Sequence, residues 1–310
     1  MSTHASFPAL SARQWRQIGV ITLAALGTYA FMRWLPTGTN LSHMDFRVDA
    51  QNSIEFCDPL NPQFIPVVAV ASPIAMSIAA PPAVAGRPVR ATVVLKTASG
   101  KPIAPADLLV VHTRRLHLMI VDPALKDYQH LHPDPVGDGG RWEFEFTPLA
   151  SGVYRVFADF TPAATNRGLY AHADLRVAAP EGAAPEVLAA RTAASGLTDD
   201  YDFKLTPRTL PLRAKQTIDL RFTVARKGGG AVPLEPVMDA YAHLVAFDES
   251  RSGFAHLHPA EADLSQKPDA THPELNFKIT IPRAGRYVIW SQVNLGGHEA
   301  FVPFRFDVVD

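Results

Sequence analysis

The sequence comprises 310 residues, with 29 Lys and Arg against 30 Asp and Glu and 47% hydrophobic residues. This composition supports a substantial core, and the length favours two domains. A net charge of −1 leaves no broad basic surface, which argues against nucleic acid as a partner. The single cysteine, Cys57, excludes an intramolecular disulfide framework, and we expect it to be an unreactive thiol.

The first element in chain order is an uncharged apolar run at residues 18–32, with arginines on both sides. Together with the adjoining residues it approaches the ~17–20 residues needed to cross a bilayer. The sequence therefore predicts a transmembrane anchor at residues 17–35, with Trp34 at the membrane interface. A cleaved signal peptide is the alternative, because Thr28 and Ala30 supply small residues before a cleavage site.

The charges that flank this run predict its orientation. Arg13 and Arg16 precede it, so residues 1–16 are expected in the cytoplasm. The rest of the chain would then lie outside the cytoplasmic membrane, in the periplasm or its equivalent. The predicted protein is therefore a single-pass membrane protein, in which a polar spacer at residues 36–69 leads into the exported domains.

After the spacer, short apolar runs alternate with turn residues, as in antiparallel β-sandwiches. Residues 141–147 alternate between apolar and polar side chains, and residues 275–281 repeat the pattern. A stretch rich in Ala, Pro and Gly between these two regions is typical of a linker. The predicted fold class is all-β, with two tandem immunoglobulin-like β-sandwiches at residues 70–178 and 203–310 and a linker at 179–202.

The second half of the sequence repeats the first over roughly 100 residues. Residues 117–122 match residues 243–248, and residues 128–133 match residues 254–259, both of which end in His-Leu-His-Pro. Four histidine pairs share an offset of 126 residues: His117 and His243, His130 and His256, His132 and His258, and His172 and His298. The remaining histidines are interpreted as incidental: His4, His43, His112 and His272.

The repeated histidines have a spacing that suits metal chelation. Residues i and i+2 of an extended segment point to the same side, so each His-Leu-His pair offers two imidazoles to one point. A third ligand is expected from a neighbouring strand, and a fourth from the last histidine of each copy. Asp122 and Asp248 are expected to orient a ligand ring or to ligate directly. Imidazole suits Cu(II), Zn(II) and Ni(II), and the predicted cofactor is copper or zinc. The predicted metal ligands are His117, His130, His132, His172, His243, His256, His258 and His298.

The motifs at residues 243–248, 256–259 and 284–287 resemble a group of exported bacterial proteins with immunoglobulin-like, YtkA-like domains. The first copy is similar through residues 117–122 and its own His-Leu-His-Pro motif. The resemblance covers both predicted sandwiches and implies an immunoglobulin-like fold for each. Proteins of this group are often associated with copper or other heavy metals, which implies a role in envelope metal handling.

A second interpretation gives the histidines a structural role. Imidazoles in such turns also hydrogen-bond backbone carbonyls, so they can form a network that stabilises a module for binding an envelope protein partner. Histidines packed in the neutral form would also make the fold sensitive to acid, with stability falling below about pH 6. The sequence has no Gly-X-Ser-X-Gly elbow and no Gly-rich phosphate loop, and the protein is not expected to be an enzyme. Met119, whose counterpart is Val245, is expected to pack in the core.

Overall fold

The computed structural model describes residues 10–34, 41–46, 63–69, 72–182, 199–261 and 263–310. Cys57 lies outside this part of the chain, and so do residues 183–198 of the predicted linker. The chain divides into two units, Met1–Asn40 and Leu41–Asp310. Each unit is described by itself.

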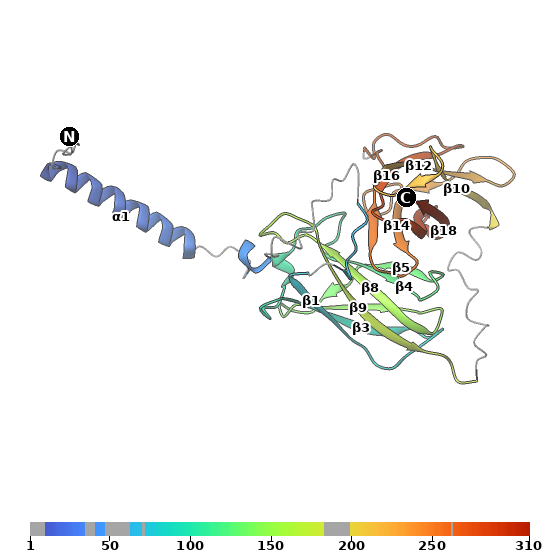
Figure 1. The fold of residues 1–310 in the computed structure, drawn as a ribbon, viewed down its shortest axis with the longest axis horizontal. Helices are drawn as coiled ribbons and strands as arrows, with labels where there is room; N and C mark the ends of the chain where they lie inside the picture. The colour runs from blue at the N-terminus through green and yellow to red at the C-terminus, as the bar shows by residue number, and fades with distance from the viewer. Residues whose placement is uncertain (1–9, 35–40, 47–62, 70–71, 183–198, 262) are drawn as a thin grey trace. The chain divides into compact units, whose positions relative to one another are not determined.

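The first unit contains helix α1 (Ala12–Trp34) (Figure 1). Reciprocal hydrogen bonds mark its start: the Gln14 N–H donates to Ser11 Oγ at 3.3 Å, and the Ser11 N–H donates to Gln14 Oε1 at 2.8 Å. Among the described residues, no helix combines the length and the apolar character needed to cross a membrane. The prediction of a transmembrane segment at residues 17–35 is therefore not supported, although a helix does lie there.

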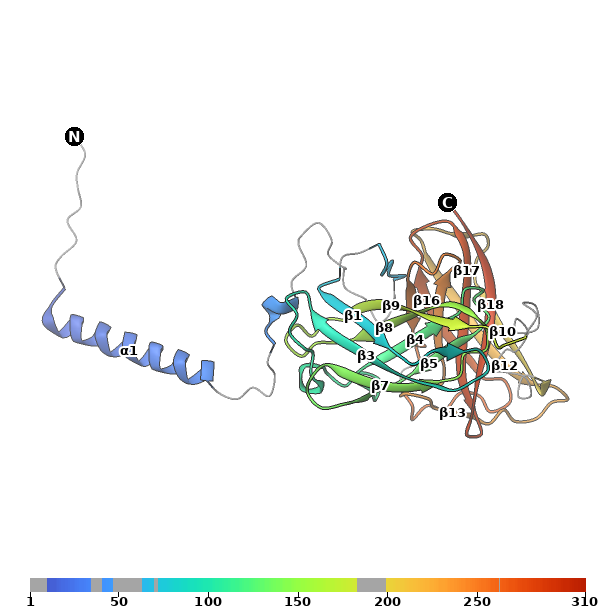
Figure 2. The same ribbon diagram turned by 90° about the horizontal axis from the view of Figure 1, so that it is seen from below.

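The second unit begins with a β-sandwich. One of its sheets has four strands in the order β1 (Ile74–Ala79), β3 (Val89–Thr97), β7 (Arg141–Phe146), β6 (Asp134–Pro135) (Figure 2). The other has five strands in the order β2 (Ala83–Val84), β9 (Leu169–Ala178), β8 (Gly152–Phe160), β4 (His117–Val121), β5 (Tyr128–Leu131). Two short 3-10 helices also belong to this unit, η1 (His43–Phe46) and η2 (Pro105–Asp107).

A second sandwich follows with the same plan. Its smaller sheet has the order β10 (Tyr201–Pro207), β12 (Thr217–Arg226), β16 (Glu274–Thr280). Its larger sheet has the order β11 (Leu212–Arg213), β18 (His298–Val309), β17 (Gly285–Leu295), β14 (His243–Asp248), β15 (Phe254–Leu257), and β13 (Leu234–Glu235) also pairs with β17. The short pairs β2–β9 and β11–β18 are parallel, whereas the long ladders are antiparallel.

The alternation of apolar and polar side chains along the strands explains how the two sheets of each sandwich pack over a core. On β7, the apolar residues Trp142, Phe144 and Phe146 are buried in the first core, whereas the charged residues between them face outward. Strand β16 shows the same period-two pattern in the second core. These features confirm the all-β class and the two tandem immunoglobulin-like sandwiches.

Strands β4 and β14 are buried on both faces. Leu118 on β4 packs in the core of the first sandwich, whereas Met119 belongs to a separate cluster with residues from both sandwiches. Phe247 on β14 joins this shared cluster, and its ring lies 5.4 Å from that of Tyr128 on β5. The larger sheets of the two sandwiches therefore pack against each other, with β4 and β5 beside β14 (Figure 1).

Hydrogen bonds also cross the interface between the two sandwiches. Arg155 on β8 donates to the carbonyl of Arg251 at 2.9 Å, and Arg251 donates to the carbonyl of Val153 at 2.7 Å. The backbone of Ile65, which precedes the first sandwich, pairs with Phe254 of the second through N–H···O bonds of 2.8 and 3.1 Å. Several hydrogen bonds thus stabilise the interface between the two sandwiches.

Gly253 is required for the pairing between Ile65 and Phe254. A Cβ at this position would lie 1.8 Å from the carbonyl oxygen of Ile65, a backbone atom that cannot move without disturbing the pairing. Gly253→Ala is expected to lower the free energy of unfolding by about 1–3 kcal/mol, measured by urea denaturation. Gly139→Ala is the control, because a Cβ there meets nothing within 4 Å. Equal losses in the two variants would contradict this account.

Candidate metal centre

Three histidines of the first sandwich converge on one point. His117 is the first residue of β4, and His130 on β5 pairs with Met119, so both side chains lie on the same face of the sheet. His132 lies just beyond the end of β5. Each of these imidazoles has a nitrogen within 4.8 Å of the corresponding nitrogens of the other two. His117 and the His-Leu-His pair therefore converge, as metal binding by these three residues requires.

The second sandwich repeats this group. His243 is the first residue of β14, His256 lies on β15, and His258 follows that strand. They form a second set of three imidazoles with nitrogens within 4.8 Å of one another. We call the group of His117, His130 and His132 triad 1, and the group of His243, His256 and His258 triad 2.

Backbone carbonyls fix the protonation of the first histidine in each triad. The Nε2 atom of His117 lies 3.0 Å from the carbonyl oxygen of Val111, and that of His243 lies 2.9 Å from the carbonyl oxygen of Val237. A carbonyl oxygen only accepts hydrogen bonds, so a neutral ring must carry its proton on Nε2. The Nδ1 atom of each ring is therefore left with a lone pair.

The carbonyls of Val111 and Val237 come from matching strained turns. The two residues after Val111 have φ angles of 49° and 68°, and the two after Val237 have φ angles of 49° and 61°. Non-glycine residues seldom adopt this left-handed conformation, which costs roughly 1–2 kcal/mol for each residue. Both copies retain this strain at the point where the turn orients a histidine, as is typical of functional sites.

The second histidine of triad 1 is oriented by a residue of the other sandwich. His130 Nδ1 lies 2.8 Å from Gln292 Oε1, and the amide nitrogen of Gln292 donates to Glu299 at 2.8 Å. Because the carboxylate of Glu299 accepts the amide N–H, the amide oxygen must face His130. His130 therefore donates from Nδ1, and its Nε2 atom keeps a lone pair.

Triad 2 has the reciprocal arrangement. His256 Nδ1 lies 3.3 Å from a carboxylate oxygen of Asp159 on β8 of the first sandwich. A carboxylate accepts the proton from Nδ1, so Nε2 is again the nitrogen with a free lone pair. Asp159 and Gln292 occupy equivalent strand positions, opposite His117 and His243 respectively. Each sandwich thus orients a histidine of the other.

The inner nitrogens of each triad face one another without an assigned proton between them. His117 Nδ1 and His130 Nε2 are 3.2 Å apart, and so are His243 Nδ1 and His256 Nε2. Two ligands on a tetrahedral ion with bonds of 2.0–2.1 Å are separated by ~3.3 Å. The Nε2 atoms of His132 and His258 are buried and have no hydrogen-bond partner within the described part of the chain. Each triad therefore brings two nitrogen lone pairs and a third, unpartnered imidazole to one point.

Burial keeps the imidazoles neutral. It lowers the pKa of His132 to about 3 and that of His243 to about 4. Burial, followed by the neighbouring imidazoles, places the pKa values of His130 and His256 well below the ordinary value. Neutral imidazole is the form that binds metal ions, so the triads are ready for binding at neutral pH.

Two predicted ligands lie outside the triads. His172 on β9 is opposite Phe157, whereas the residue opposite Trp290, the counterpart of Phe157, is Pro303. The strand register therefore matches His172 with Pro303 and not with His298. His298 is exposed at the start of β18, opposite Leu295. The expected completion of each ligand set by His172 and His298 is not found, because the gap between the copies shifts the register here.

The two predicted aspartates have a different role from the expected one. Asp122 accepts backbone N–H bonds from Lys126 and Asp127 at 2.6 and 2.8 Å. Asp248 accepts a backbone N–H bond from Ser252 at 2.7 Å. They stabilise the turns that follow β4 and β14, and the carboxylate that bonds a triad histidine is Asp159. Asp159 cannot be recognised from the internal repeat, because its counterpart in the second copy is Gln292.

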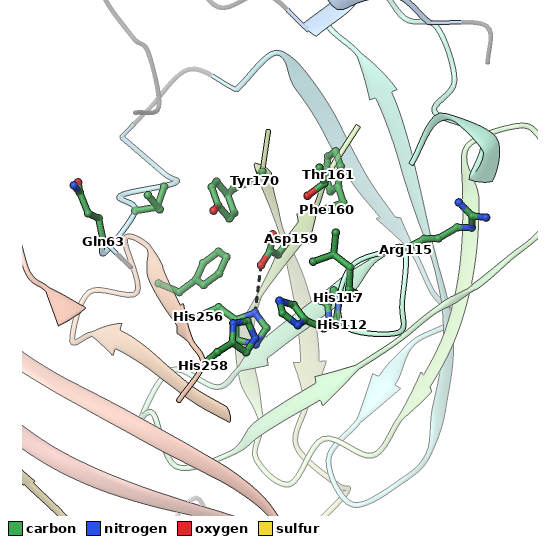
Figure 3. Close-up of a pocket in the computed structure, with 14 residues that line it drawn as sticks. Gln63, His112, Arg115, His117, Asp159, Phe160, Thr161, Tyr170, His256 and His258 are labelled. Carbon is green, nitrogen blue, oxygen red and sulfur yellow. Dashed lines mark hydrogen bonds and ion pairs between the residues drawn. The ribbon is translucent and has the colours of Figure 1, made fainter. Parts of the chain in front are cut away.

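A pocket of about 220 Å³ reaches the histidines from one side, lined by His112, His117, Asp159, His256 and His258 among others. Figure 3 shows Asp159 pointing at His256 and His112 close to His258. The rings of His112 and His258 are 3.7 Å apart and inclined by 35°. His112, interpreted from the sequence as incidental, is therefore part of the site. Its counterpart is Met238, so comparison of the copies gave no signal for it.

Comparison with protein families identifies one match. Residues 73–177 and 195–310 match the model of a family described as a domain of unknown function (DUF8832). The chain belongs to this family. The match does not support the YtkA-like label suggested by the short motifs. No curated protein matches the sequence.

Several solved structures are similar to the chain at low identity. A Corynebacterium diphtheriae protein named as membrane anchored has 9% identity and a TM-score of 0.23, with coverage of 76% of this chain and 59% of that chain. Salmonella alpha-2-macroglobulin has 11% identity and a TM-score of 0.25, with coverage of 76% and 16%. Fibronectin(III)-like modules of Clostridium thermocellum CbhA have 9% identity and a TM-score of 0.19, with coverage of 76% and 93%. The chain spans less than two thirds of the length of the first two.

The depressed histidine pKa values predict acid sensitivity of the metal-free protein. The unfolded chain takes up protons below about pH 6.5, whereas the folded imidazoles stay neutral to lower pH. Stability is therefore complete above about pH 6.5 and falls toward pH 4, by up to ~1.4 kcal/mol per pH unit for each buried histidine. Urea denaturation at pH 7.5, 6 and 5 measures this loss. His272→Ala, at an exposed position, should leave the slope unchanged, and a flat profile in the parent protein would contradict the prediction.

Proposed function

We propose that this protein binds transition-metal ions, copper or zinc, one in each triad, and acts in metal handling. The observation that carries the proposal is the pair of inner nitrogens 3.2 Å apart in each triad, whose outer nitrogens are committed to acceptors. Two facing lone pairs repel each other, and a cation between them removes that repulsion. Three neutral imidazoles suit copper and zinc, and the third comes from His132 or His258.

Three protein ligands leave a fourth coordination position open on a tetrahedral ion. The pocket beside His117, His256 and His258 gives solvent a route to this region. An ion held in this way can exchange with a donor or an acceptor, which fits storage or transfer of the metal. The absence of an enzymatic role and the location outside the cytoplasm remain predictions from the sequence.

Metal content tests the proposal directly. The full chain, loaded with Zn(II) or Cu(II) and then dialysed, is expected to retain about two equivalents by elemental analysis. His130→Ala and His256→Ala are each expected to lose one equivalent, because each removes a central ligand of one triad. His172→Ala and His298→Ala are the controls, since both residues lie outside the triads. Retention of two equivalents by His130→Ala and His256→Ala would contradict the assignment.

Metal binding is also expected to stabilise the fold. An ion that binds only the folded chain, present at a hundredfold excess over its dissociation constant, adds about 2.7 kcal/mol to the free energy of unfolding. Thermal unfolding with and without Zn(II) measures this gain, which His243→Ala should reduce. The purely structural interpretation of the histidines predicts no gain with metal and a similar loss of stability in every triad variant.

A further inference from the structure

The two triads lie close enough to influence one another. The rings of His130 and His256 are 5.2 Å apart, those of His117 and His256 are 5.8 Å apart, and those of His130 and His243 are 6.3 Å apart. An ion in each triad would lie ~2 Å from a nitrogen of these rings, which places the two ions on the order of 10 Å apart or less. Two divalent ions at such a spacing repel each other strongly inside a protein, where water screens them poorly.

The charges around the triads are unequal. Triad 2 has a carboxylate partner, Asp159, on the outer nitrogen of His256, whereas triad 1 has the neutral amide of Gln292 on the outer nitrogen of His130. Glu299 lies behind Gln292 and is exposed, so solvent screens its charge. A carboxylate partner makes an imidazole a more basic ligand and offsets the charge of the ion. Asp159 also lies opposite His117 of triad 1, but its direct hydrogen bond is to His256, and this bond favours triad 2 for a divalent ion.

Two other differences distinguish the triads. Arg114 carries a positive charge that acts on His117 and His132 and opposes a cation in triad 1, although Asp159, the strand partner of His117, acts on His117 in the opposite direction. Its counterpart near triad 2 is the neutral residue Ala240. The pocket is lined by two ligands of triad 2, His256 and His258, but by only one ligand of triad 1, His117. An ion that enters through the pocket therefore meets more of triad 2.

From these differences we propose that the triads form one two-metal centre that divalent ions fill in order. Triad 2 fills first, and triad 1 fills second with at least tenfold lower affinity. The inference rests on the proposed function, since it requires that the triads bind metal. It adds that Asp159 and Gln292 set the order, and that the first ion opposes the second.

Calorimetric titration of the metal-free full chain with Zn(II), against a competing chelator, tests the order of filling. Two steps are expected, with dissociation constants that differ at least tenfold. His258→Ala should remove the tighter step and His132→Ala the weaker one, and these are matched variants because each deletes the last ligand of its triad. Removal of the tighter step by His132→Ala, or two equal steps in the parent protein, would overturn the proposal. Absence of any binding would instead overturn the proposed function.

Charge variants test the cause. Asp159→Asn keeps the shape of the side chain and should weaken the tighter step by ten- to a hundredfold. Gln292→Glu should strengthen the weaker step, with circular dichroism to confirm that the variant is folded. If Gln292→Glu does not fold, Asp159→Asn decides alone, and an unchanged tighter step in that variant would overturn the assignment of Asp159.

Monovalent copper provides an independent measurement on the unmodified chain. Repulsion scales with the product of the two charges, so it is fourfold smaller for two Cu(I) ions than for two Zn(II) ions. Titration with Cu(I) under a reducing atmosphere, against a Cu(I) chelator, should therefore bring the two steps closer together. An equal or larger gap for Cu(I) would contradict repulsion between the sites as the cause.

Discussion

Two hydrogen bonds across the interface between the sandwiches determine the chemistry of the site. His130 donates to Gln292, and His256 donates to Asp159. Each bond holds a proton on the outer nitrogen and turns the inner lone pair toward another histidine. Because each acceptor belongs to the opposite sandwich, neither triad is fully oriented by its own domain. The packing of the two larger sheets is therefore a condition for the site as well as for stability.

The duplication of the chain explains why the site is nearly symmetric. Each copy supplies a histidine at the start of a strand, one on the next strand and one beyond it, and each copy orients the first with a strained turn. The differences lie in the surroundings of the triads. Asp159, His112 and Arg114 of the first copy are replaced at the equivalent positions of the second copy by Gln292, Met238 and Ala240. Two sites with the same ligands but different neighbouring charges are expected to bind metal ions with different affinities.

Much of the fold could be predicted from the sequence, because strand alternation and the internal repeat are local or periodic signals. The strictly alternating strand of Trp142, Phe144 and Phe146 is an example, and so is the same-side placement of His130 and His132. Contacts between the copies could not be predicted in this way. Asp159 and His112 join the site only through sheet packing, and neither is conserved between the two copies.

The occurrence of histidines at the same offset in both copies correctly indicated the triad residues, but it wrongly indicated His172 and His298 as further ligands. The second case failed because sequence offset does not follow strand register across an insertion or deletion, and the ladder places Pro303 where His298 was expected. At the N-terminus, the apolar run correctly predicted a helix over most of Ala12–Trp34. The local pattern was sufficient to predict secondary structure in both regions, but it was insufficient to predict the strand register at His298.

The choice between a structural network and a metal centre depends on the third histidine of each triad. One proton shared between His117 and His130 would satisfy two facing lone pairs and needs no third imidazole. His132 would then still leave a buried nitrogen without a partner, as the structure shows for its Nε2 atom, at a cost of about 1–3 kcal/mol. Burial also opposes such a proton, since it lowers the pKa values of these rings. A metal ion can bind three imidazoles at once, whereas a shared proton joins only two. The presence of a third histidine in each group therefore favours metal ions over shared protons.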